Sequence, residues 1–301
     1  YFGGPKGNPA IKNLIIRSIP DMGTQQAELM SGGIHWMYNV KKDVGEAMAK
    51  TGKADYQIGP SLRIGFLVLD AGGYSGEGNP ITKLDVRRAM NHAINRESIA
   101  KNLIGGPAKG IHTACNPVVF GCFQDVMKYD YNPEKAKSLL ASAGYPNGFD
   151  LDLWSYRDKE AAQAMADDLG KVGIKINLRH GKLAGLNKAR KERQIRAYFG
   201  TWGSSASPDT ATISNIHWRD PNKGDRNLSG DPKVNELMLG AEQTLDIDER
   251  KKLYAEGLKL IAEQAYWVPL WSYSEGVLSS KDINFKQDAD GYPRIWNITW
   301  N

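Results

Sequence analysis

The pattern of hydrophobic and polar positions is clearest in the middle of the chain, where its period changes repeatedly. Alternation with a period of two predicts strands at 149–155, 174–180 and 195–202. Between them, apolar positions three and four residues apart predict helices at 159–173 and 183–193. An order of strand, helix, strand, helix and strand is typical of crossover connections. We therefore expect a largely parallel sheet covered by helices.

Capping residues mark several further helices. The helices expected at 132–144 and 231–243 each begin with a capping Asn or Asp, followed by proline at the first helical position. Residues 84–106 form two predicted helices that meet at Asn95 and end at a pair of glycines. A long amphipathic helix is expected at 248–265. These helices extend the same α/β lobe.

The start of the chain has a different pattern. We expect a strand at 12–20, a helix at 24–33, and strands at 34–40 and 61–70. The stretch 71–83, AGGYSGEGNPITK, is rich in residues that break helices and strands. We expect it to carry the chain from a first lobe into the α/β lobe.

Residues 267–277, WVPLWSYSEGV, are predicted to form a strand with aromatic side chains at alternate positions. Trp267, Trp271 and Tyr273 would then share one face, which could be core or the wall of a cleft. We expect this strand to bring the chain back to the first lobe, where the final residues supply a last strand.

The sequence thus predicts two lobes. Lobe one comprises 1–78 plus 270–301, and lobe two comprises 79–269. The hinge strands are expected at 71–83 and 267–277. Ligand pockets favour the space between domains, so we expect the ligand between the lobes.

Composition excludes some classes of protein. The hydrophobic share of 41% and the charged share of 24% are ordinary for a globular protein, and no apolar run approaches the ~20 residues of a membrane-spanning helix. The net charge of +5 is modest. The densest basic stretch, 188–196, lacks the interleaved aromatic residues that stack on bases, and its Arg190 and Arg193 fit a solvated helix face. No nucleic-acid partner is expected.

The chain has two cysteines, Cys115 and Cys122. Zinc needs about four ligands, and no further cysteine or histidine pair supplies them. The residues between the cysteines include a proline and a glycine, so the stretch can close into a small disulfide loop. Two unpaired thiols are the alternative. A disulfide would indicate an oxidising compartment such as the periplasm.

Four stretches of the sequence resemble one protein family. They are LIIRSIPDMGTQQAELMSGGIHW (14–36), LDVRRAMNHAINRESIAKNLIGG (84–106), YDYNPEKAKSLLASAGYPNGFDLDLW (129–154) and DERKKLYAEGLKLIAEQAYWVPLW (248–271). In combination they are similar to the substrate-binding proteins of ABC transporters in the peptide, opine and nickel group (extracellular solute-binding family 5).

The resemblance implies an α/β fold of the type II periplasmic-binding-protein kind, with two lobes joined by hinge strands. Lobe one is expected to be incomplete, because members of this family carry a long segment before the position of YFGG (1–4). That segment would be present as a separate chain, or a neighbour would cover the open sheet edge.

The resemblance also implies a function. We expect a periplasmic receptor, not an enzyme and without a cofactor, that closes its lobes around a peptide or peptide-like solute. It would deliver this solute to an inner-membrane ABC permease.

The family's ligand loop corresponds to residues 200–220. Peptide-binding members resemble W-x-x-D at this point, and the acidic residue holds the peptide's amino group. Here Ser205 takes that position after Trp202. A buried ammonium needs a carboxylate partner, so we expect a solute without a free α-ammonium, or one bound by other groups. Asp209 either replaces the missing acid or is a turn residue after proline.

Other candidate ligand-binding residues come from the loop and from expected strands. Arg63 could bind a carboxylate or phosphate, or form a surface salt bridge. Aromatic residues could form ligand contacts or fill the core. The aromatic and loop candidates are Trp36, Tyr38, Trp202, Ser204 and Trp218.

Two hypotheses from other classes stay open. A serine hydrolase could use Ser204 or Ser205 with His217, although no G-x-S-x-G motif is present. A structural or assembly role without ligand binding is the other. No metal is expected, because the histidines are scattered along the chain.

Overall fold

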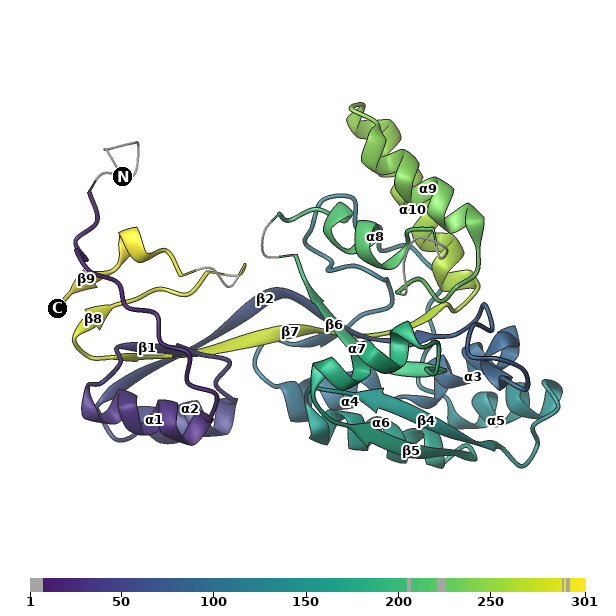
Figure 1. Ribbon diagram of the computed structural model, residues 1–301, viewed down its shortest axis with the longest axis horizontal. Coiled ribbons are helices and arrows are strands. Elements are labelled where there is room, and N and C mark those ends of the chain that lie inside the picture. Colours follow the sequence, from purple (N-terminus) through teal and green to yellow (C-terminus); the bar gives the residue numbers. More distant parts are fainter. Residues whose placement is uncertain (1–7, 205–206, 221–225, 289, 291–292) are drawn as a thin grey trace. The chain divides into compact units, whose positions relative to one another are not determined.

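The computed structural model describes residues 8–204, 207–220, 226–288, 290 and 293–301, and its contacts divide the chain into two units (Figure 1). Unit 1 comprises Tyr1–Ser61, Ile104–Pro107 and Ser274–Asn301. Unit 2 comprises Leu62–Leu103 and Ala108–Tyr273.

The chain passes between the units inside two long strands. β2 (Ala54–Leu69) belongs to unit 1 as far as Ser61, and β7 (Trp267–Ser280) belongs to unit 2 as far as Tyr273. The chain therefore re-enters unit 1 within 267–277, the segment expected from the sequence. It leaves unit 1 within β2, before the glycine-rich stretch 71–83.

The glycine-rich stretch is a loop of unit 2, held by one carboxylate. Asp70, fully buried, accepts hydrogen bonds from the backbone N–H groups of Tyr74 and Ser75 at 2.9 and 2.8 Å. The side chain of Asn79 donates to the same carboxylate at 3.0 Å. The glycines serve turns in this loop, with positive φ at Gly73 among others. A count of breaker residues cannot distinguish such a loop from a crossing between lobes.

Unit 1 combines two helices with short strands. Its elements, besides its parts of β2 and β7, are α1 (Met22–Ser31), β1 (Trp36–Tyr38), α2 (Lys42–Ala49), β8 (Ile283–Asn284), the 3₁₀ helix η3 (Ile295–Asn297) and β9 (Thr299–Trp300). β1 pairs antiparallel with β7, and β8 pairs antiparallel with β9. The last strand expected near the end of the chain is confirmed as β9.

The prediction of a strand at 12–20 is wrong. This segment forms no strand, and Leu14, Ile15 and Ile16 are 56%, 82% and 86% exposed. A strand is stabilised by its ladder with a neighbour, and no strand within the described part of the chain pairs with these residues.

Unit 2 is built on the sheet that the alternating pattern predicted. β6 (Ala197–Gly203) lies between β2 and β4 (Phe149–Ser155), and β5 (Ile174–His180) follows β4 at the edge. β4 runs parallel to both β5 and β6, whereas β2 runs antiparallel to β6. The short strand β3 (Lys109–Gly110) pairs with β7. The strands expected at 149–155 and 174–180 are confirmed to the residue.

Helices cover this sheet (Figure 1). They are the 3₁₀ helix η1 (Pro80–Thr82), α3 (Leu84–Ala93), α4 (Arg96–Ile99) with the π-helical turn η2 (Ala100–Ile104), α5 (Pro133–Ser142), α6 (Lys159–Gly170), α7 (Leu183–Lys191), α8 (Ala211–His217), α9 (Pro232–Gln243) and α10 (Ile247–Glu263). The expected caps are confirmed, since Asn132 accepts from Lys135 N–H at 2.9 Å and Asp231 from Lys233 N–H at 2.8 Å. α8 was not predicted from the sequence.

An aromatic cluster forms part of the core of unit 2. Trp267, 2% exposed, stacks on Phe66 with the ring centroids 3.9 Å apart. Trp218 lies 4.8 Å and His217 5.1 Å from the same indole. The cluster connects β2 and β7 to α8 and the residue that follows it.

The aromatic residues of β7 do not share one face, contrary to expectation. Trp267 contacts Phe66, whereas Trp271 contacts Phe199 at 5.7 Å. Phe199 pairs in register with Leu67, the neighbour of Phe66, so the two tryptophans lie on opposite faces of the sheet. Pro269 lies between them and has no N–H for the ladder, and the period of two is not kept across it.

The basic stretch 188–196 is only partly a solvated face. Lys188 and Lys191 are exposed, but Arg190 is 5% exposed and packs inside unit 2. The prediction was wrong for Arg190, because α7 covers the sheet with the side of the helix on which Leu186 and Ala189 are also buried.

The predicted disulfide between Cys115 and Cys122 is confirmed, with the two Cα atoms 5.7 Å apart. Cys115 is fully buried in the same core region as Trp267. The loop that the disulfide closes carries Phe120, whose N–H donates to the carbonyl of Pro208 at 2.8 Å. The bridge therefore anchors the residues that follow β6.

Reduction of this disulfide should lower the free energy of unfolding by about 2–3 kcal/mol, because closing a loop of this length removes entropy from the unfolded chain. Urea denaturation with and without a reductant measures the loss. A Cys115→Ser/Cys122→Ser variant is the control and should be insensitive to the reductant. Equal midpoints for the oxidised and reduced wild-type protein would contradict the prediction.

Candidate functional site

β4 ends beside the first residues of the parallel strand β6 in unit 2, since Leu153 pairs with Ala197 and Trp154 with Tyr198, and the residues that follow β4 lie beside the remainder of β6. Ligands of open α/β sheets bind outside the carboxyl ends of the strands. Residues of four segments lie around this edge, with Trp202 on the opposite face of the sheet from Arg63 and Thr201. We call the set the carboxyl edge: Arg63 of β2, Tyr156, Arg157 and Asp158 after β4, Thr201 and Trp202 of β6, and Tyr273 of β7.

Arg63 is fixed at this edge by β6. Its Nη1 donates to Thr201 Oγ1 at 3.2 Å. The hydroxyl of Tyr156 lies 3.2 Å from the same oxygen atom. The guanidinium group and the phenol are therefore held next to each other by one threonine, and both residues are partly exposed.

Tyr273 connects β7 to the turn after β4. Its hydroxyl donates to Asp158 Oδ2 at 2.5 Å, and Arg157 Nε lies 3.5 Å from the same carboxylate oxygen. The guanidinium carbon of Arg157 lies 5.5 Å from the centroid of the Tyr273 ring, a cation–π arrangement. Burial and the charge of Asp158 raise the pKa of Tyr273 well above its ordinary value. The hydroxyl therefore stays protonated and remains a donor.

The charges of the carboxyl edge are unequal. Arg63 and Arg157 contribute two guanidinium groups, and Asp158 contributes one carboxylate. The carboxylate already accepts from Tyr273.

Trp202 lies at the same end of β6 but on the other face of the sheet. It pairs in register with Ile64, whereas Thr201 pairs with Gly65. Its ring is half-buried and meets His217 edge-on at 5.6 Å. Arg63 and Trp202, both candidate ligand-binding residues in the sequence, thus lie at the same edge of the sheet but on opposite faces.

The predicted loop residues have mixed outcomes. Ser204 is 4% exposed and accepts a hydrogen bond from Thr212 Oγ1 at 2.9 Å. Ser205 lies outside the described residues. Asp209 accepts from Arg250 Nη2 at 2.9 Å and from Ala211 N–H at 2.8 Å. These contacts favour a turn residue over a partner for a solute's ammonium.

The remaining predicted aromatic residues lie elsewhere. Trp218 is 1% exposed and fills the core beside Trp267, which favours the core alternative. Trp36 and Tyr38 are in unit 1 on one face of β1, as the alternation predicted, with their rings stacked 5.3 Å apart. They border a small groove with Phe285.

The geometry disfavours the hydrolase hypothesis for Ser204. Its hydroxyl is hydrogen-bonded to Thr212, and His217 is 2% exposed among the rings of Phe66, Trp202 and Trp267. Neither ring nitrogen of His217 has a hydrogen-bond partner among the described residues. A nucleophile needs a base within hydrogen-bond reach.

Buried histidines should make the protein sensitive to acid. Burial, with Arg226 and Arg190 nearby, holds the pKa of His217 well below its ordinary value, and burial with Arg96 lowers the pKa of His112 to about 4. Between about pH 6.5 and pH 4 these histidines are protonated in the unfolded chain but not in the folded protein. The free energy of unfolding therefore decreases as the pH is lowered through this range.

The His217→Leu variant tests this directly. Its free energy of unfolding should fall less than that of the wild type between pH 7.5 and pH 5, by roughly 2 kcal/mol. Urea unfolding at both pH values measures the difference. The same pH dependence in both proteins would show that His217 titrates normally in the fold.

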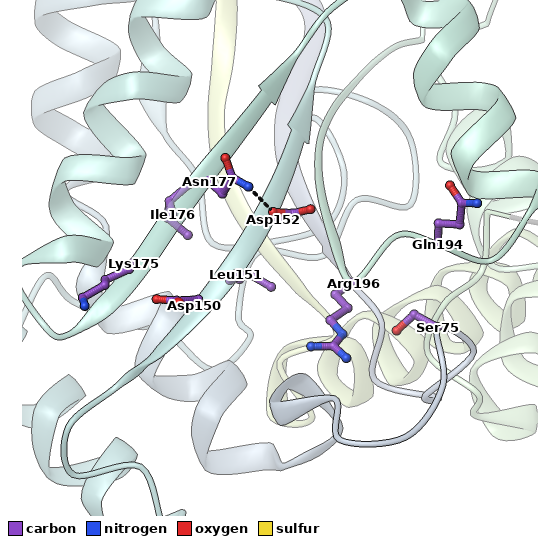
Figure 2. A pocket seen from close by; sticks show the side chains of 9 residues that line it. All are labelled: Ser75, Asp150, Leu151, Asp152, Lys175, Ile176, Asn177, Gln194 and Arg196. Carbon is purple, nitrogen blue, oxygen red and sulfur yellow. Dashed lines mark hydrogen bonds between the residues drawn. The ribbon is translucent and has the colours of Figure 1, made fainter.

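A separate polar groove of about 800 Å³ lies on the sheet, lined by β4, β5 and the residues before β6 (Figure 2). Asp150 and Asp152 face Lys175 and Asn177 there, beside Arg196. Asp152 accepts from Asn177 Nδ2 at 2.7 Å and from Arg179 Nε at 3.2 Å. The lining of this groove has no net charge, because it contains two carboxylates and two cationic side chains. The groove lies at the amino-terminal halves of β4 and β5. We do not assign the ligand to this groove.

Two further findings concern the described part of the chain. No three His, Cys, Asp or Glu side chains within it gather as a metal site. None of its helices combines the length and apolar character needed to cross a membrane.

Comparison with known proteins places this architecture in one class. Residues 1–225 match the family model described as "Bacterial extracellular solute-binding proteins, family 5 Middle". The chain therefore belongs to the bacterial extracellular solute-binding proteins of family 5, and its fold is that of a type II periplasmic binding protein.

Named relatives are solute-binding proteins. Heme-binding protein A of Haemophilus influenzae is 26% identical over 307 residues, covering 98% of this chain and 55% of the relative. Glutathione-binding protein GsiB of Salmonella paratyphi A is 26% identical over 283 residues, covering 88% and 53%. The crystal structure of NikA from Brucella suis in complex with Fe(III)-EDTA is similar with a TM-score of 0.83 at 21% identity, covering 100% and 64%. The chain spans about half the length of the curated relatives it matches.

Proposed function

We propose that this protein is the substrate-binding component of an ABC importer and that its solute is a small peptide-like compound bound through its carboxylates at the carboxyl edge. The observation that carries the proposal is the presence of two guanidinium groups at this edge, Arg63 held by Thr201 and Arg157 held by Asp158. An arginine binds a carboxylate through two parallel hydrogen bonds, which gives both strength and orientation.

The acidic partner that an α-ammonium group needs is engaged within unit 2. Asp209 forms an ion pair with Arg250, and the position of the family's ammonium-binding acid is Ser205. An ammonium buried without a carboxylate costs several kcal/mol. The solute therefore presents carboxylates to this protein.

The names of the relatives support a solute with carboxylates. One relative is named for haem and another for glutathione. Both compounds carry two carboxylates, and haemin has no ammonium group. Glutathione is also peptide-like, and its free α-ammonium would have to be bound by groups other than Asp209. We take glutathione as the first probe and haemin as the second.

The proposed setting follows from the family. The protein acts in the periplasm and delivers its solute to an inner-membrane permease. The disulfide Cys115–Cys122 suits an oxidising compartment. No chemical step on the solute is involved.

Thermal unfolding with added probes tests this function. A ligand at a hundred times its Kd stabilises a protein by about 2.7 kcal/mol. Glutathione or haemin should raise the melting temperature, and the cationic dialanine amide should not. Stabilisation by the cationic probe alone would contradict a carboxylate-binding site. The absence of any effect from all three would favour a structural role for the chain.

A further inference from the structure

Asp158 has an unusual backbone and an unusual use of its side chain. It is the residue before α6, with φ 45° and ψ 61°, in the left-handed region that non-glycine residues rarely adopt. An Asp at this position normally accepts a hydrogen bond from the first turn of the helix. The side chain of Asp158 makes no such capping bond.

The carboxylate of Asp158 is instead turned towards Tyr273. The hydroxyl donates to Oδ2 at 2.5 Å, and Arg157 Nε lies 3.5 Å from the same oxygen. Backbone strain persists only where surrounding contacts impose it, and it is concentrated at ligand-binding and switch sites. The contact that imposes it here comes from a residue 115 positions along the chain.

Tyr273 is itself fixed. It is 6% exposed, and Trp271 meets its ring at 6.1 Å in a T-shaped arrangement. The ring lies against β2 at Gly65, where an added Cβ would be 3.2 Å from Tyr273 Cε2. The glycine therefore leaves the space that this ring occupies.

The tyrosine contacts both members of the Arg157–Asp158 pair. Its ring lies under the Arg157 guanidinium, and its hydroxyl holds the Asp158 carboxylate. The carbonyl of Arg157 also accepts from Ser155 Oγ at 3.4 Å. An arginine held in this way loses less rotamer entropy on binding than a solvated one.

We propose, on the basis of the function above, that Tyr273 and Asp158 are positioning residues that orient Arg157 for the carboxylate of the solute. Neither needs to contact the solute. The strained turn at Asp158 is kept because it sets the direction of the neighbouring guanidinium group.

A double-mutant cycle tests this in binding. By titration calorimetry with glutathione, Tyr273→Phe should weaken the Kd about 5–10-fold, and Arg157→Ala should weaken it more. The double variant should bind no worse than Arg157→Ala, because the tyrosine acts through the arginine. An additive loss in the double variant, or an unchanged Kd for Tyr273→Phe, would overturn the proposal.

Tyr266 provides a matched control. Its hydroxyl donates to Asp231 Oδ2 at 2.8 Å, and it is 8% exposed. Tyr266→Phe therefore also removes a buried tyrosine–aspartate bond but should leave the Kd unchanged. An equal loss in Tyr266→Phe would assign the effect to general stability and refute positioning.

A readout without ligand separates this inference from the proposed function. In ¹⁵N-labelled protein, the Arg157 Nε–Hε signal is assigned by its loss in Arg157→Lys. It should be sharp and slowly exchanging in the wild type, and broadened in Tyr273→Phe. If the signal is unchanged in Tyr273→Phe, positioning is wrong even if the protein binds glutathione. If it broadens and no anionic probe binds, positioning stands and the proposed solute class fails.

Discussion

Replacing Trp267 by alanine is expected to lower the free energy of unfolding by about 4 kcal/mol, the typical cost of deleting a buried aromatic side chain. The indole is 2% exposed and stacks on Phe66 at 3.9 Å. Trp218 and His217 pack against the same ring, so its removal leaves a cavity bordered by three rings. Equilibrium unfolding in urea measures the loss.

Trp300 offers the matched control. It is 54% exposed in unit 1, and Trp300→Ala should change the free energy of unfolding by less than about 0.5 kcal/mol. If Trp267→Ala lowered the free energy of unfolding by less than about 1 kcal/mol, the aromatic cluster would not be a main contributor to the stability of unit 2.

Replacing Arg157 by alanine is expected to weaken glutathione binding by about 2 kcal/mol, on the order of 30-fold in Kd. A hydrogen bond to a charged group contributes this much when it is shielded from water. Arg157 is 28% exposed and is held beside Asp158 and Tyr273. Titration calorimetry measures the Kd, and a parallel urea melt shows whether the fold is kept.

Arg179→Ala is the control for charge. It removes the same positive charge from β5, where Arg179 pairs with Asp152 beside the polar groove. Its Kd for glutathione should equal that of the wild type. If Arg179→Ala weakened binding and Arg157→Ala did not, the ligand would belong to the groove rather than to the carboxyl edge.

Regular patterns in the sequence predicted the sheet of unit 2 well. β5 alternates strictly and β4 does so as far as Leu153, and the buried positions of β4 keep the period of two, at Leu151, Leu153 and Ser155. Local capping chemistry predicted the starts of the helices after Asn132 and Asp231.

Elements whose formation depends on tertiary contacts were not predicted correctly. α8 has seven residues, includes β-branched side chains, and lacks a side-chain cap at Thr210, so its packing in unit 2 determines it. The apolar segment at 12–20 has a strand-like composition, but a strand also requires a neighbour to pair with.

Two of the residues at the carboxyl edge are candidates that the sequence already indicates, Arg63 from its place on an expected strand and Trp202 as an aromatic residue flanking the ligand loop of the family. Arg157, Asp158 and Tyr273 were not identified as a group, because Tyr273 is far along the chain from the other two. The positive φ of Asp158 leaves no mark in its residue type, since tertiary contacts impose it. The one available signal in the sequence is the aromatic segment that contains Tyr273, whose alternation also fits the wall of a cleft.

Hydrogen exchange in the presence of glutathione tests the central claim most directly, namely that a carboxylate-bearing solute binds at the carboxyl edge. Saturating glutathione should slow exchange in peptides covering 155–160 and 197–204, and leave 174–177 at the polar groove unchanged. Protection confined to 174–177, or equal exchange with and without glutathione throughout unit 2, would contradict it.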